Sequence, residues 1–237
     1  MNRHEAELTV GSGGYARTTG DFNFKTGDNA ALRVNAMWNG SGAYGTYGAG
    51  LDKKGVAAAY RHGIGMSDEC LVGPYHLDNH NGIHYGMPWL QRSASDTTRI
   101  LVPADPKNYY GASSDYSAGS ATYGTLGHVH RFQGGGELRT TFRAGHYERD
   151  QRASAIRFAA AGLQPGGLAV TGDTLGGATV LTRGSNNKIQ NLDARTLQSD
   201  YSGKFDGFGL KHALLAGIDM TDDAFVGYAA SIQAGTS

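Results

Sequence analysis

Apolar and polar residues alternate with a period of two along much of this chain. Ala6, Leu8 and Val10 alternate with polar neighbours, and the segment 32–38 alternates in the same way. Successive side chains of a β-strand point to opposite faces, so each such segment predicts a strand with one apolar and one polar face. Nine strands are expected, at 5–10, 15–25, 32–38, 56–64, 71–80, 122–132, 138–144, 189–201 and 210–220.

The connections between these segments alternate between short and long. Short polar connections are expected at 26–29, 66–69 and 133–136, with a slightly longer one at 203–209. The long connections are expected at 39–55, 81–121 and 150–188. In an up-and-down sheet this order puts all long loops at one end, as in outer-membrane barrels, and strands of roughly ten residues suit a tilted bilayer crossing.

Two places interrupt the pattern. Pro74 lacks a backbone donor, so it is expected only at a sheet edge or at a bulge. Between Leu192 and Leu197 the apolar positions change parity, which predicts a bulge, an insertion or a different strand boundary.

The composition favours an all-β protein. The 37 glycines and 13 tyrosines, against 5 prolines, suit tight turns and aromatic strands. The net charge is zero and the basic residues are spread along the chain, which argues against a nucleic-acid partner. The single cysteine, Cys70, excludes an internal disulfide and is interpreted as a small buried or lipid-facing side chain.

The sequence contains no apolar run near the roughly 20 residues of a membrane-spanning helix. This excludes a helical membrane protein only, because barrel strands place apolar residues at alternate positions. The segment 1–5 has no apolar stretch typical of a signal peptide, so an exported protein would begin upstream of it.

Several segments resemble TonB-dependent siderophore receptors, particularly those for ferric catecholates. EAELTVGSGGYARTTGDFN resembles the first barrel hairpin of that family. HYGMPWL, DPKNYYG and SDYSAGSATYG resemble its third extracellular loop and the following strand, and HALLAGIDM resembles a recurrent barrel strand. The resemblance covers nearly the whole chain, and the order and spacing of the segments are more specific than any one of them.

The resemblance implies an antiparallel up-and-down transmembrane β-barrel fragment. Residues 1–237 would form about nine or ten strands of a 22-stranded barrel, open or partly closed, without the plug domain and the C-terminal strands. The implied function is TonB-dependent uptake of ferric siderophores across the outer membrane of a Gram-negative bacterium. The implied partners are the ferric siderophore, outer-membrane lipid and, through the missing plug region, the TonB complex; no cofactor and no enzymatic activity are expected.

An aromatic-rich loop is the candidate site for the iron chelate. Aromatic faces stack on catecholate rings, and arginines offset the negative charge of a ferric complex. The alternative is that these aromatic side chains pack the loop against itself or lie in an interfacial girdle. The candidate residues are Tyr85, Trp89, Arg92, Arg99, Tyr109 and Tyr110, with Lys107 nearby.

Arg139, Arg143 and Arg149 form a basic row on one predicted strand. On the lumen face they would either guide anions or form ion pairs. Ion pairs are the favoured interpretation, and the expected partners are Glu5, Glu7 and Asp21.

A metal site is a weaker alternative. His76, Asp78 and His80 share a face of one predicted strand, where His128 or His130 of the next would complete a ligand set. The favoured interpretation is a solvated, lumen-facing polar row. No HExxH, GxSxG or paired-cysteine pattern supports a metal-dependent hydrolase. A soluble secreted β-sheet domain, of the adhesin or carbohydrate-binding kind, is the main alternative to a receptor.

Overall fold

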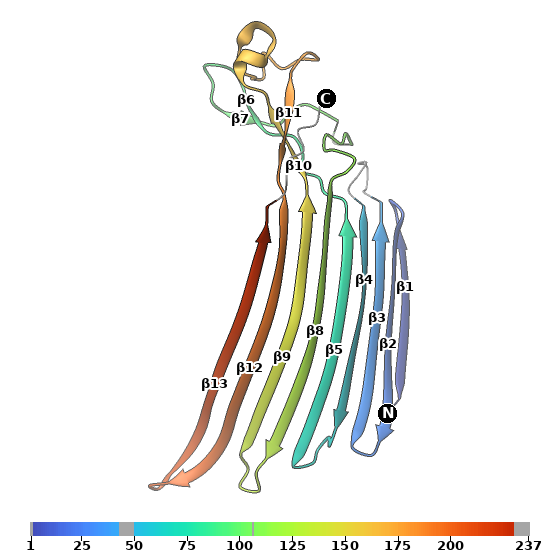
Figure 1. Ribbon diagram of the computed structural model, residues 1–237, viewed down its shortest axis with the longest axis vertical. Helices are drawn as coiled ribbons and strands as arrows, with labels where there is room; N and C mark the ends of the chain where they lie inside the picture. The colour runs from blue at the N-terminus through green and yellow to red at the C-terminus, as the bar shows by residue number, and fades with distance from the viewer. Residues whose placement is uncertain (1, 43–49, 106, 230–237) are drawn as a thin grey trace.

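A single nine-stranded antiparallel sheet dominates the computed structural model, which describes residues 2–42, 50–105 and 107–229 (Figure 1). Expectations that involve Met1, residues 43–49, Pro106 or residues 230–237 lie outside the described residues. The strands pair in chain order, as an up-and-down sheet requires. They are β1 (Arg3–Gly11), β2 (Tyr15–Gly27), β3 (Ala30–Ser41), β4 (Leu51–His62), β5 (Asp68–Asn81), β8 (Tyr116–Arg131), β9 (Glu137–Arg152), β12 (Lys188–Gly207) and β13 (Leu210–Tyr228).

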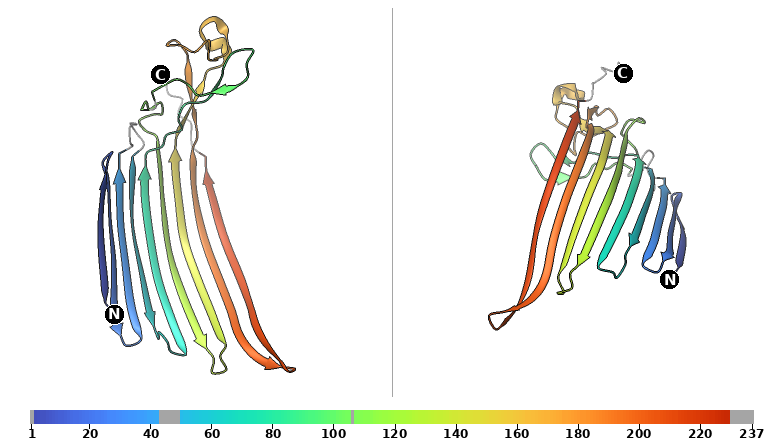
Figure 2. Two further views of the ribbon diagram at one scale, coloured as in Figure 1. Left: turned by 180° about the vertical axis from the view of Figure 1, so that it is seen from behind. Right: turned by 60° about the horizontal axis from the view of Figure 1, so that its bottom comes forward.

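All nine predicted strands are therefore confirmed, and most are longer than the sequence pattern indicated. The sheet is curved but does not close, because β1 and β13 each have one neighbour within the described part of the chain (Figure 2). No helix among the described residues is long and apolar enough to cross a membrane.

The long connections all leave the same rim of the sheet, as predicted (Figure 1). They contain short elements that the sequence did not reveal. Residues 82–115 contain the hairpin of β6 (Leu90–Gln91) and β7 (Arg99–Ile100). Residues 153–187 contain β10 (Ser154–Phe158), β11 (Leu181–Ser185) and the 3₁₀ turns η1 (Ala161–Leu163) and η2 (Pro165–Gly167).

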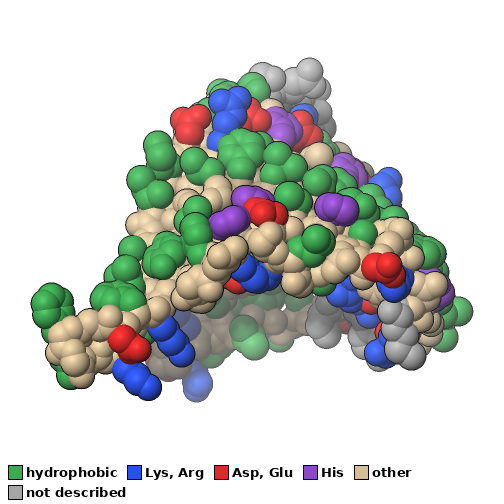
Figure 3. Space-filling model, turned by 90° about the horizontal axis from the view of Figure 1, so that it is seen from below, with side chains coloured by type: hydrophobic (Ala, Val, Ile, Leu, Met, Phe, Trp, Pro, Cys, Tyr) green, Lys and Arg blue, Asp and Glu red, His purple; other side chains and the backbone are tan. Residues whose placement is uncertain are grey.

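The two faces of the sheet differ in chemistry. Residues paired across neighbouring strands share a face, so the strand register assigns each side chain to one side. On the convex side, called here the outward face, most positions in the middle of the strands are apolar. They include Phe22, Trp38, Val72, Leu126, Phe142 and Met220. The opposite, concave side is called here the hollow face. It carries many lysines and arginines, and the contrast between the two faces is visible from the short-turn rim (Figure 3).

Pro74 lies in a central strand, so the expectation of an edge or a bulge is wrong. β5 pairs with β4 on one side and with β8 on the other. The ladder between β4 and β5 is interrupted beside Pro74, between the pairs Ala57–Tyr75 and Tyr60–Val72, and resumes in the same register. The missing backbone donor therefore costs local pairing without changing the face of any later residue.

The parity change near Leu192 is not a bulge either. β12 pairs with β9 and with β13 without a register shift over this stretch. Leu192 lies on the hollow face and Leu197 on the outward face. The one register irregularity in the described sheet lies elsewhere, between Lys25 and Gly27 of β2.

Aromatic rings lie flat over glycines two residues away in the same strand. A β-carbon added at Gly20 would lie 2.7 Å from the Phe22 ring, and one at Gly40 would lie 2.7 Å from the Trp38 ring. The same arrangement joins Tyr147 to Gly145. The glycine and tyrosine content of the chain thus serves strands as well as turns, because the ring covers backbone that glycine leaves exposed.

The turn between β12 and β13 is shorter than predicted and consists of Phe208 and Gly209. Both have positive φ angles, 53° and 76°, which is the type I′ geometry that favours Asn-Gly. Phe208 is fully exposed, so its side chain gains little packing in return for the left-handed conformation.

Phe208→Asn should therefore raise the free energy of unfolding by about 0.5–1 kcal/mol, measured by urea titration of the refolded protein. Gly209→Ala is the matched control and should lower it, whereas an unchanged value for both would contradict the argument.

Candidate ligand-binding site

The two longest connections, residues 82–115 and 153–187, pack together above one rim (Figure 1). Gln91 forms an isolated parallel bridge with Thr171, and the Gly172 amide donates to the Gln91 carbonyl over 2.8 Å. Farther along, the Arg183 Nε donates to the Tyr110 carbonyl over 2.9 Å. These contacts join segments far apart in sequence into one loop assembly, called here the cap.

Asp115 is the polar junction of the cap. Its Oδ2 accepts hydrogen bonds from the Ala112 amide (3.0 Å) and the Ser154 amide (2.9 Å). Its Oδ1 accepts one from the Ser154 hydroxyl (2.9 Å). One carboxylate thus holds the end of the first loop against the start of β10, and charged acceptors form stronger hydrogen bonds than neutral ones.

Tyr85 connects the cap to the hollow face. Its hydroxyl accepts hydrogen bonds from Gln151 Nε2 (2.9 Å) and Asn186 Nδ2 (2.8 Å). The buried Gln151 in turn accepts one from Arg149 Nη2 over 2.6 Å. The structure therefore brings a predicted loop residue and a predicted basic-row residue together, through a glutamine that the sequence did not single out.

Tyr109 and Tyr110 stabilise the cap. The Tyr109 hydroxyl lies 3.2 Å from the Ile83 carbonyl and 3.1 Å from the Ala112 carbonyl, so it donates within its own loop. Burial, reinforced by the nearby Asp115, raises the pKa of Tyr109 and keeps the phenol protonated as a donor. Tyr110 contributes its backbone carbonyl to the contact with Arg183.

Trp89 and Arg99 form an exposed pair in the same loop. The guanidinium carbon of Arg99 lies 3.7 Å from the centre of the Trp89 ring, and Trp89 is 50% exposed. Arg92 instead pairs with Asp96, over 3.5 Å. Hydrogen bonds from Thr98 lower the pKa of Asp96, with a smaller contribution from Arg92. Of the six predicted loop residues, the stacked pair presents the most accessible combination of an aromatic face and a positive charge.

Arg139, Arg143 and Arg149 lie on the hollow face, in one row of β9. Arg139 pairs with Glu137 at 3.2 Å. Arg143 donates from Nε to the Thr125 hydroxyl over 3.1 Å, and its guanidinium carbon lies 4.7 Å from the centre of the Tyr123 ring. Within the described ranges, neither Arg143 nor Arg149 has a carboxylate at ion-pair distance.

The expected ion pairs with Glu5, Glu7 and Asp21 do not form. Those acids lie on β1 and β2, several strands away from β9. Glu5 pairs with Arg3, Asp21 pairs with Arg33 at 2.6 Å, and Glu7 accepts a hydrogen bond from Thr9. The prediction that pairing neutralises the basic row is therefore wrong. On the hollow face, Arg143 and Arg149 therefore remain without a carboxylate partner among the described residues.

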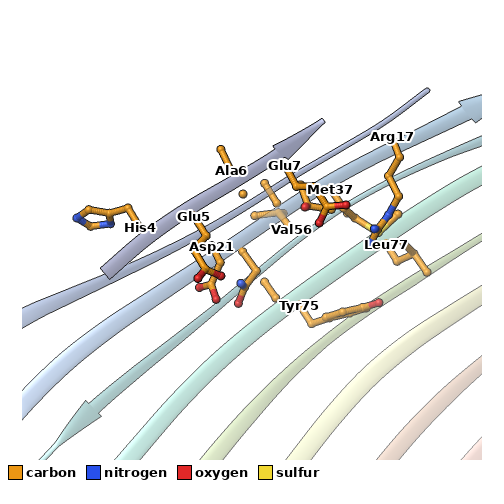
Figure 4. Close-up of a pocket in the computed structure, with 16 residues that line it drawn as sticks. His4, Glu5, Ala6, Glu7, Arg17, Asp21, Met37, Val56, Tyr75 and Leu77 are labelled. Atoms are coloured by element: carbon orange, nitrogen blue, oxygen red, sulfur yellow. The ribbon is translucent and has the colours of Figure 1, made fainter. Parts of the chain in front are cut away.

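A pocket of about 780 Å³ lies beside Glu5, Glu7 and Asp21, near β1. Glu5 and Asp21 extend to the same side of the sheet, and Tyr75 borders the pocket farther along (Figure 4). Tyr75 stacks on Tyr123, with ring centres 4.5 Å apart and an interplanar angle of 14°. Because Arg143 packs on Tyr123, the stack of Tyr75, Tyr123 and Arg143 joins the pocket to the basic row. The sequence did not reveal this stack, since its three members come from three strands.

The histidine row has a different orientation from the predicted one. His76, Asp78 and His80 lie on the outward face, not the hollow face. His76 hydrogen-bonds to Thr122 at 2.7 Å, and His80 stacks on Tyr116. His128 and His130 pair instead with Cys70 and Asp68, near the opposite rim. Over the described ranges no three His, Cys, Asp or Glu side chains come together as metal ligands, so the metal alternative has no support there.

These features define the class: an open segment of a large up-and-down antiparallel β-barrel, with an apolar outward face and a loop cap on one rim. No protein-family model matches the sequence. The chain is 25% identical over 237 residues to the catecholate siderophore receptor Fiu of Escherichia coli O157:H7. The match covers 94% of this chain and 30% of that protein, so the chain spans about a third of the length of the curated relatives it matches.

Solved structures show the same fold. The ferric-catecholate import receptor Fiu from E. coli K12, in its closed form, matches with a TM-score of 0.82 and 24% identity, over 95% of this chain and 32% of that chain. The siderophore receptor PiuA from Acinetobacter baumannii matches with a TM-score of 0.81 and 20% identity, over 95% and 30%. The chain is therefore homologous to Fiu over most of its length, and its sheet has the barrel fold of siderophore receptors.

The homology favours the receptor interpretation over a soluble secreted domain. The exposed apolar side chains agree with it, because a water-soluble sheet buries one face against another layer. Phe142 and Leu126 are 38% and 53% exposed on the outward face. The matched relatives are receptors and not enzymes.

Proposed function

We propose that residues 1–237 are part of the barrel domain of a TonB-dependent outer-membrane receptor that imports a ferric siderophore of the catecholate class. The plug domain, the remaining strands and the contact with TonB belong to the rest of such a receptor. The observation that carries the proposal is the contrast between the two faces. An apolar outward face suits lipid, and a polar hollow face with unpaired arginines suits passage of an anionic complex.

In this proposal the exposed Trp89–Arg99 pair is the contact for the ferric complex on the cap. The indole face stacks on a catecholate ring, and Arg99 offsets its negative charge. Arg143 and Arg149 then form an electropositive path below the cap. Tyr85, Tyr109 and Tyr110 act indirectly, by holding the loops that present the pair. Cargo and arginines attract each other without covalent chemistry, so no cofactor is required.

Removal of the stacked pair is the direct test. In the full-length receptor that carries this segment, Trp89→Ala and Arg99→Ala should each weaken binding of a ferric tris-catecholate about tenfold, since a desolvated cation–π or stacking contact is worth about 1–2 kcal/mol. Binding is measured with radioactive iron on purified protein. Arg92→Ala is the matched control and should bind normally, because its guanidinium is occupied by Asp96. Equal effects of Arg92→Ala and Arg99→Ala would contradict the assignment.

The basic row has its own test. Arg143→Gln should slow uptake of the complex in cells while leaving binding at the cap nearly unchanged. Arg33→Gln is the control on the same face, because Asp21 already neutralises Arg33. If the two variants take up iron at equal rates, the row does not guide the cargo.

A further inference from the structure

The distribution of histidine over the sheet is uneven. Eight of the nine histidines lie on strands, and all eight side chains belong to the outward face; the ninth, His84, lies in the cap. Three of the eight are near the cap. The other five lie toward the short-turn rim and are called here the histidine belt: His4, His62, His128, His130 and His212.

Four of the five belt histidines have an aromatic or acidic partner on the same face. Aromatic ring centres lie 4.9 Å apart for His4 and Phe24, and 4.5 Å for His130 and Phe132. His212 stacks on Phe205 at 4.9 Å. His128 and His130 both hydrogen-bond to Asp68, over 3.0 Å and 2.8 Å. An imidazole on a phenyl ring combines an apolar body with a polar edge, which suits the boundary between hydrocarbon and headgroups.

The belt is inclined to the strand pairing in the way that a membrane boundary requires. Heights can be compared by following paired residues from one strand to the next as far as β12. This path leads from His4 to Arg195, and from both His62 and His128 to Ser199. It leads from His130 to Tyr201, and from His212 to Phe205. Except for His128, which shares the row of His62, the belt therefore descends steadily from β1 to β13 instead of following one row of paired residues.

The slope of this descent matches a barrel. About ten residues along β12, at ~3.3 Å each, amount to roughly 33 Å. The eight steps from β1 to β13, at ~4.8 Å each, amount to roughly 38 Å. The belt thus lies at about 40° to the pairing rows, inside the ~35–45° tilt of strands in membrane barrels. In a barrel tilted in this way, His4, His62, His130 and His212 lie at one height, and His128 lies two residues closer to the cap than His130 on β8.

The basic side chains on the same face agree with a boundary. Among the described residues, the outward-facing Lys54, Arg152 and Arg195 lie toward the cap, whereas the acid Asp68 lies within the belt and is bonded to His128 and His130. Apolar side chains continue above it, as in β13, where Leu214 and Ile218 follow His212.

We propose that the histidine belt lies among the phospholipid headgroups at the short-turn side of the membrane, with the imidazole N–H groups of His4 and His62 donating to lipid phosphates, and that this contact sets the depth of the barrel in the bilayer. The N–H groups of His128, His130 and His212 are held within the protein, by Asp68 and by the Gly207 carbonyl. The proposal rests on the proposed function, since it requires an outer-membrane barrel. It assigns a partner, the phosphate layer of one leaflet, to residues that take no part in cargo transport.

The chain provides its own depth probe. Cys70 is the only cysteine, is exposed on the outward face, and pairs with His62 on one side and His128 on the other. A nitroxide on Cys70 reports the level of the belt. A second label, on Ala58→Cys with Cys70→Ala, lies four residues higher than His62 along β4, which is ~13 Å along the strand and roughly 10 Å in depth.

The experiment uses the full-length receptor, with any cysteine outside this segment replaced, in phosphatidylcholine vesicles. Depth is measured by the competition of oxygen and a nickel chelate for each nitroxide. The Cys70 label should read the headgroup level, and the Ala58→Cys label should read roughly 10 Å deeper. Replacing all five belt histidines by leucine should move the Cys70 label several ångströms into hydrocarbon, and replacement by glutamine, which keeps a donor, should restore most of the original depth.

Two results would overturn the belt alone: equal depth for both labels within hydrocarbon, or a Cys70 depth that the leucine variant leaves unchanged. If both labels are instead fully accessible to the nickel chelate in water, the proposed membrane location fails, and the belt fails with it. The two failures are therefore distinguishable.

Discussion

Phe142→Arg is expected to lower the stability of the inserted barrel in lipid vesicles. Phe142 lies on the outward face of β9, in the middle of the apolar band, where it pairs with Leu126 and Leu197. An arginine at that level of a membrane barrel costs about 2–4 kcal/mol of folding free energy. The measurement is the free energy of unfolding of the full-length receptor from vesicles, by urea titration.

The adjacent residue is the control. Thr141 lies next in sequence, but its side chain points into the hollow, so Thr141→Arg should change the unfolding free energy by less than about 1 kcal/mol. Two arginines one residue apart would then differ in effect through orientation alone. Equal costs for the two variants would show that the assignment of the faces is wrong.

Asp115→Ala is expected to separate the two loops of the cap. The substitution removes three hydrogen bonds to a carboxylate and leaves the Ala112 and Ser154 amides without that acceptor. The docking of the loops should weaken by about 2–3 kcal/mol. The informative readout is hydrogen exchange at the Gly172 amide, which binds Gln91 and does not touch Asp115. Its exchange should accelerate roughly 30- to 160-fold, while strand amides are unaffected.

Asp96→Ala is the control for the cap. Asp96 makes its contacts within its own loop, with Thr98 and Arg92, so its removal should leave exchange at Gly172 unchanged. Unchanged exchange at Gly172 in Asp115→Ala would mean that the contacts between Gln91 and the second loop form independently of this carboxylate. The cap would then not act as one unit, and Asp115 would serve only its immediate neighbours.

The cap and the basic row form one connected structure. Tyr85 is linked to Arg149 through Gln151, so displacement of the first loop would change the hydrogen bonds of Arg149 at the cap end of β9. Arg149 is the row member nearest the cap, and Arg143 lies lower on the same strand. A cargo passed from Trp89 and Arg99 to the hollow face would meet Arg149 first and Arg143 second.

The strands were predictable because the information is local. Whether Leu8 and Glu7 lie on opposite faces depends on the geometry of an extended chain, so a period of two is visible without any partner. The alternation of short and long connections then determined that all the long loops lie on one rim. Pro74 and the parity change at Leu192 misled for the opposite reason. Neighbouring ladders tolerate one missing bond, and a hollow face accepts an occasional leucine, neither of which the sequence reveals.

The candidate site was only partly predictable. The aromatic and basic residue types were found in the right segments, because chemistry that recognises an anionic aromatic complex needs them. Their roles differ, however, according to contacts between residues far apart in the chain. Tyr85 is held by Asn186, and Tyr110 by Arg183, whereas the Trp89–Arg99 pair remains accessible.

The sequence by itself determined the strands, their two faces and the rim that carries the loops, since each depends on residues close together in the chain. Only the tertiary structure decided which arginines stay unpaired, which tyrosines hold the cap, and that His76 faces outward. It also aligned four histidines from four strands, His4, His62, His130 and His212, at one inclination, because strand register and tilt are properties of the assembled sheet.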